Sequence, residues 1–173
     1  MKILFTKTKT AAAVLCLCLL FGACSKLKKP DSDSTPPVLK WKIHFIEDNT
    51  DTEVTENAKT IKVKKGTEVR VTLIAEDTDG GVQKIMLGGG FTFHCVSGSV
   101  GQNSNGLLET DVQNLYPDAN GNVLPSIFLI KNVSTAFTCQ SGYTLTNGSF
   151  DLVGTAENYY NGVTHSMLKI ETE

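Results

Sequence analysis

Apolar and polar residues alternate one by one over several stretches of this chain, and that period of two constrains the fold more than any other feature. Residues 39–45 read LKWKIHF, with an apolar side chain at every odd position. The same alternation returns in residues 69–75 and 91–95. Successive side chains of a β-strand point to opposite faces, so each stretch is predicted to be a strand with one buried face.

Shorter apolar stretches extend this pattern along the chain. We expect further strands at residues 61–63, 82–87, 127–130, 150–156 and 163–170. Asn-Gly and Gly-Gly pairs, which favour tight turns, punctuate the strands, and the three glycines at 88–90 predict a turn between strands 82–87 and 91–95. No segment keeps a helical apolar period over three turns. The sequence therefore predicts an all-β, antiparallel sandwich or barrel in one domain, residues 38–173.

The first 23 residues have the features of an export signal. Lys2, Lys7 and Lys9 precede 13 uncharged residues at positions 11–23. That stretch is too short to cross a bilayer as a helix, which needs about 20 residues. We therefore expect residues 1–23 to be a removable signal peptide.

The end of this signal resembles the lipobox of bacterial lipoproteins. The residues Phe21-Gly22-Ala23-Cys24 place a large apolar residue and two small ones before a cysteine. The resemblance implies that Cys24 is acylated, becomes the first mature residue and anchors the chain in a membrane of the bacterial cell envelope. The residue after Cys24 is Ser25 and not aspartate, and this resembles the pattern of lipoproteins that are sent to the outer membrane. An ordinary secretory signal with an incidental cysteine is the alternative.

Residues 24–37 are predicted to be a flexible tether after the lipidated cysteine. The sequence SKLKKPDSDSTPP, at positions 25–37, is rich in proline, hydroxyl and charged residues and cannot form a core. Fully extended, it reaches about 45 Å at most.

The net charge limits the kinds of partner that we expect, and the cysteine content bears on a disulfide in the predicted domain. Three of the 16 Lys and Arg residues precede Cys24, so 13 remain against 18 Asp and Glu, a formal net charge of −5. This excess of negative charge argues against nucleic acid and anionic lipid head groups as partners. Cys95 and Cys139 are the two cysteines of the predicted domain. In an oxidising compartment they predict one disulfide, with a reactive thiol pair as the alternative.

Two segments resemble parts of bacterial immunoglobulin-like modules. Residues 66–87 contain an alternating strand, an A-x-D-x-D-G sequence and a second strand, like a B–C hairpin. Residues 148–171 resemble the closing F–G hairpin. The resemblance implies an antiparallel immunoglobulin-like β-sandwich. Residues 88–148 depart from it, and either an additional hairpin or a differently wound sandwich fits them.

The same resemblance implies that the B–C and F–G loops lie at one end of the domain. It would bring Asp77 and Asp79 near Glu157 and Asn158, a set of oxygen ligands suited to calcium. Asp-x-Asp-Gly is also ordinary turn chemistry, so solvated loops without a metal are the alternative. No other cofactor is expected.

Tyr159 and Tyr160 fall in the predicted F–G turn, beside asparagines. Flat aromatic rings with amide neighbours suit contact with a glycan or a protein. The alternative is that one ring covers the edge of the core.

The sequence contains no catalytic signature such as G-x-S-x-G, H-E-x-x-H or a glycine-rich phosphate loop, so we expect no enzymatic activity. The preferred hypothesis is a lipid-anchored envelope module for binding, adhesion or scaffolding, with an envelope protein or glycan as partner. The alternative is a small envelope inhibitor or chaperone-like lipoprotein that presents residues 97–106 to a target enzyme. A hydrolase using Asp77 and Asp79 is the least favoured reading.

Overall fold

The computed structural model describes residues 27–29 and 31–173. The predicted signal peptide and Cys24 lie outside these residues. The described part is built from strands, and it contains no helix long and apolar enough to cross a membrane. The strands are β1 (Leu27–Lys28), β2 (Val38–Phe45), β3 (Thr50–Val54), β4 (Lys59–Val63), β5 (Glu68–Glu76), β6 (Val82–Ser97), β7 (Val100–Asn114), β8 (Asn122–Val123), β9 (Ser126–Ser134), β10 (Thr144–Asn158) and β11 (Val163–Thr172).

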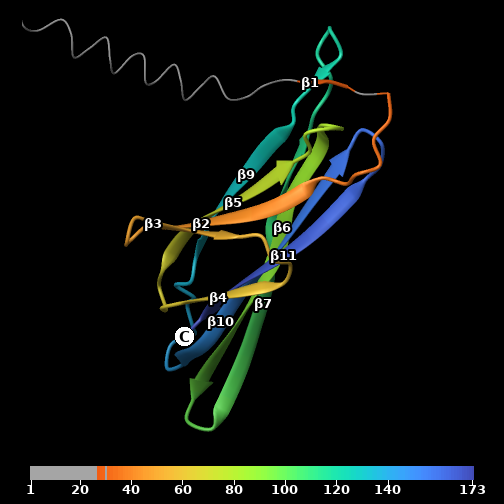
Figure 1. Ribbon diagram of the computed structural model, residues 1–173. Helices are drawn as coiled ribbons and strands as arrows, with labels where there is room; N and C mark the ends of the chain where they lie inside the picture. The colour runs from red at the N-terminus through yellow and green to blue at the C-terminus, as the bar shows by residue number, and fades with distance from the viewer. Residues whose placement is uncertain (1–26, 30) are drawn as a thin grey trace, which may run out of the picture.

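The strands form two main sheets that pack together as a β-sandwich (Figure 1). One sheet has the order β4-β11-β10-β6-β7 and the other β3-β2-β5-β9, while β1 and β8 form a separate pair. Neighbouring strands are antiparallel except β11 and β4, which run parallel. The all-β expectation is confirmed, and the parallel pair is a departure from a purely antiparallel fold.

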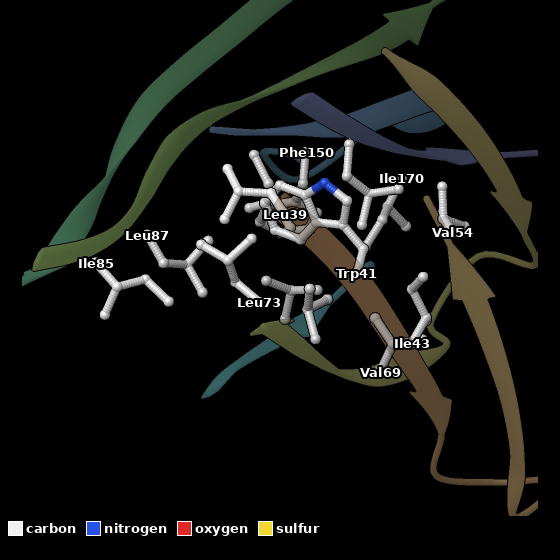
Figure 2. Close-up of a cluster of buried hydrophobic side chains, with 14 of the residues drawn as sticks. Leu39, Trp41, Ile43, Val54, Val69, Leu73, Ile85, Leu87, Phe150 and Ile170 are labelled. Atoms are coloured by element: carbon white, nitrogen blue, oxygen red, sulfur yellow. The ribbon is translucent and has the colours of Figure 1, made fainter. Parts of the chain in front are cut away.

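The core lies between the two main sheets, where the alternating apolar positions meet. Figure 2 shows Trp41 among buried side chains that come from both sheets. The Trp41 ring is fully buried, and its Nε1 donates a hydrogen bond to Ser166 Oγ at 2.8 Å. Gly154 leaves the room that the ring needs, because a Cβ there would lie 3.1 Å from Trp41 Cζ2 and 2.7 Å from Leu73 Cδ1. The apolar face predicted for residues 39–45 is therefore the centre of the sandwich.

The predicted turn at residues 88–90 is wrong, because β6 continues through the three glycines. The register between β6 and β7 shifts between Leu87 and Gly89, which marks a bulge. Gly89 has a φ of 145°, and a Cβ there would lie 2.1 Å from the carbonyl oxygen of Asp151. The glycines thus allow a close approach of β10 instead of reversing the chain.

The long strands β6 and β7 give the domain two distant ends. Val82 begins β6 beside β8, since its N–H donates to the Leu124 carbonyl at 2.9 Å. The strand has 16 residues and ends at Ser97, where the turn into β7 forms a tip that extends beyond the other strands (Figure 1). We call residues 96–101 the β6–β7 tip, and residues 27–29 with 116–123 the β1–β8 end.

The described residues of the tether contact the domain. Leu27 and Lys28 pair with Val123 and Asn122, and the Lys29 N–H donates to the Gly121 carbonyl at 3.0 Å. The sequence predicts a flexible tether without fixed contacts. The structure differs because backbone groups of the tether bond to β8 and to Gly121 just before it.

Candidate functional site

The residues predicted to bind calcium are only partly brought together. Asp77 and Asn158 are buried side by side, as the resemblance implies for two loops at one end. Asp79 is exposed, and it is its backbone N–H that contacts Asp77 Oδ1, at 3.2 Å. Glu157 lies in β10 opposite Lys84 and does not join the pair. Among the described residues, no group of three or more His, Cys, Asp or Glu side chains is placed to hold a metal ion.

The Asn158 amide nitrogen instead joins two carboxylates. Its Nδ2 lies 2.9 Å from Asp33 Oδ2, 2.9 Å from the Thr35 carbonyl oxygen and 3.2 Å from Asp77 Oδ2. A buried carboxylate is costly unless donors satisfy it. The amide therefore ties the tether to the β5–β6 loop, and it faces the carboxylates as a donor where a metal ligand would present oxygen.

The Asn158 amide oxygen holds the turn between β10 and β11. It accepts hydrogen bonds from the N–H groups of Tyr160, at 3.0 Å, and Gly162, at 2.8 Å. Asn161 within this turn has a φ of 64°, which asparagine adopts more readily than most residues. One side chain thus organises the tether, a loop and a turn, and we call this contact set the Asn158 corner.

Tyr159 and Tyr160 are half-buried, and the tether lies over them. Lys29 Nζ lies 5.4 Å from the Tyr159 ring centroid and 5.3 Å from that of Tyr160, which is cation–π distance. Burial raises the pKa of Tyr159, and its hydroxyl has no hydrogen-bond partner among the described residues. Burial also raises the pKa of Tyr160, helped by the charges of Asp31 and Asp33. Contact of these rings with a glycan or protein stays a prediction.

Cys95 and Cys139 form the predicted disulfide, with their Cα atoms 5.9 Å apart. The bond joins the far part of β6 to the segment that follows β9. Aromatic rings pack nearby, with centroids 5.1 Å apart for Phe93 and Phe137 and 5.2 Å for Phe137 and Phe150. The disulfide and this cluster together support the strands that lead to the β6–β7 tip.

A hollow on the outer face of the β3-β2-β5-β9 sheet is a site that the sequence reasoning missed. Its volume is about 430 Å³. Apolar side chains form its floor, with Phe128 58% and Ile130 48% exposed and Ile74 half-buried beside them. Ile74 pairs with Phe128 across β5 and β9 in the sheet register. The sequence did contain a signal for this hollow. Residues 73–75 (LIA) and 127–130 (IFLI) are apolar at consecutive positions, so these strands carry apolar side chains on both faces of the sheet.

Basic side chains border this hollow. Lys42 Nζ lies 2.9 Å from Asp51 Oδ2, and His44 Nδ1 lies 2.9 Å from Asp51 Oδ1. The hydrogen bond from Lys42, and then that from His44, hold the pKa of Asp51 below its usual range, while Asp51 raises the pKa of Lys42. Arg70 donates to Asn132 Oδ1 at 3.4 Å, and no carboxylate of the described residues forms an ion pair with it. The border of the hollow thus includes a guanidinium that no carboxylate of the described residues neutralises in an ion pair.

No protein-family model matches the chain, and no curated protein is significantly similar to it in sequence.

Proposed function

We propose that this chain is a lipid-anchored, non-catalytic binding module of the bacterial cell envelope. In this proposal Cys24 carries the lipid, the outer membrane is the destination, and the hollow around Phe128 binds an envelope protein. The observation that carries the binding role is the hollow itself. Exposed apolar side chains that gather on one face and are bordered by polar or basic side chains are typical of interaction surfaces.

We further propose that the sandwich is immunoglobulin-like. The order β11-β10-β6-β7 matches strands G-F-C-C′ of such domains, and β2-β5-β9 matches A-B-E. The disulfide departs from the pattern, since it joins β6 to the segment after β9 and not the two sheets through B and F. The strand order supports the fold assignment, whereas fold alone carries no function.

The chemistry of the hollow suggests what the partner presents. Ile74, Phe128 and Ile130 suit apolar side chains, and Arg70 suits a carboxylate. We therefore expect the partner to contribute a segment that combines apolar residues with Asp or Glu.

Site-specific photo-crosslinking in intact cells tests this proposal. A photoreactive residue in place of Ile130 is expected to give one discrete adduct, and Arg70→Glu in the same chain should abolish it by repelling the acidic segment. Val153, 39% exposed in the opposite sheet, is the matched control position and should give no such adduct. Equal adducts from both positions, or an adduct unaffected by Arg70→Glu, would reject the hollow as the binding site.

The inhibitor alternative is tested by the same experiment. Residues 97–106, expected to be a loop, form the turn at the β6–β7 tip and the start of β7. A photoreactive residue in place of Ser99 reports on this tip. An adduct from position 99 but not from 130 would favour the inhibitor over the binding face.

A further inference from the structure

We propose that the β1–β8 end of the domain lies against the membrane surface, and that the β6–β7 tip points away from it. This inference rests on the proposed function, because it needs Cys24 to be the lipidated residue. It goes beyond that function by assigning an orientation and a second contact surface, whose partner is the lipid head-group region.

The chain between Cys24 and β1 is short. Only Ser25 and Lys26 separate Cys24 from Leu27, the first residue of β1. Three residue steps span about 11 Å at full extension. The start of β1 therefore cannot lie farther than that from the lipidated cysteine.

β1 is attached to the body of the domain. Leu27 pairs with Val123, a fully buried residue of β8. Gly81 packs against Val123 so closely that a Cβ there would lie 2.4 Å from Val123 Cγ2. The Asn158 corner holds the tether a second time, through Asp33. The domain cannot turn away from the anchor without breaking these contacts.

The surface of the β1–β8 end carries side chains that suit a membrane interface. Tyr116 is 83% exposed, and Lys28 and Lys29 of the same end are exposed as well. Tyrosine is enriched at membrane–water interfaces, and lysine is attracted to anionic head groups. Asp118, an acidic residue of this end, is half-buried and accepts hydrogen bonds from the N–H groups of Asn120 and Asn122 at 2.9 Å.

The opposite end is then far from the membrane. The 16 residues of β6 run from the β8 side to the β6–β7 tip. At about 3.3 Å per residue the tip lies about 50 Å from the β1–β8 end. The hollow lies on a side face of the sandwich between these ends, so a partner reaches it without meeting the membrane.

Fluorescence quenching on vesicles tests this orientation. Ala119→Cys, in the β1–β8 end, and Ser99→Cys, at the tip, replace exposed turn residues and are labelled with an environment-sensitive dye. The full acylated protein is reconstituted into vesicles of phosphatidylethanolamine and phosphatidylglycerol that contain a head-group nitroxide lipid. The dye at position 119 is expected to lose most of its fluorescence, and the dye at position 99 to keep it.

A linker variant is the control for the short tether. A Gly/Ser segment of about 20 residues inserted between Lys26 and Leu27 lets the domain move away, so quenching at position 119 should fall. Equal quenching at positions 99 and 119 in vesicle-bound protein would overturn the orientation, and quenching at position 119 that is unaffected by the insertion would overturn the role of the short tether. Protein that does not bind vesicles would overturn the anchor itself, which is a separate failure.

Discussion

Replacing Asn158 with alanine is expected to lower the free energy of unfolding by about 3 kcal/mol, because a buried amide loses its bonds to two carboxylates and to two turn N–H groups. The carboxylate of Asp77 stays buried without this donor, which adds to the cost. Denaturant unfolding of the soluble form that begins at Ser25 measures the change as a lower midpoint at an unchanged slope.

Asn105→Ala is the matched control for this prediction. Asn105 is exposed on β7, so its loss should change stability by less than about 0.5 kcal/mol. Equal midpoints for the two variants would show that the Asn158 corner does not stabilise the domain.

Removing the disulfide is expected to cost about 4 kcal/mol. Cys95 and Cys139 are 44 residues apart, and opening a loop of that size restores chain entropy to the unfolded state. The double variant Cys95→Ser, Cys139→Ser should therefore unfold at a clearly lower denaturant concentration than the parent.

Reduction of the parent protein supplies the control for the disulfide. Dithiothreitol should lower the midpoint of the parent to nearly that of the double variant and leave the variant unchanged. Titration of two free thiols in the unreduced native parent would contradict the prediction.

The strands that the sequence predicts best are those with one buried and one solvated face. Residues 39–45 and 69–75 alternate because one side of each strand meets the core, and β2 and β5 confirm both expectations. β7 was missed because its first residues, VGQNSNG, are polar or small after Val100 and lie on an edge that buries little. The glycines at 88–90 misled for a different reason, since close backbone packing favours glycine as strongly as a turn does.

The candidate sites, too, were predicted only in part from the sequence. The resemblance placed Asp77 and Asn158 at one end of the domain, and the structure brings them together. It could not reveal Asp33, because the tether has no apolar pattern that would predict its docking. The hollow was missed because each alternating strand was expected to have a single apolar face, directed toward the core. Ile74 and Phe128 carry apolar surface on the opposite, outer face of the sheet.

In the proposed function the domain is held at the membrane through Cys24, and the Cys24→Ser variant tests this anchoring most directly. Cells that express the parent or the variant are fractionated, and the mature N-terminus is analysed by mass spectrometry. We predict that the parent begins with an acylated Cys24 in the membrane fraction, whereas the variant is released from membranes or remains unprocessed. A variant that is processed normally and stays in the membrane fraction would contradict the claim.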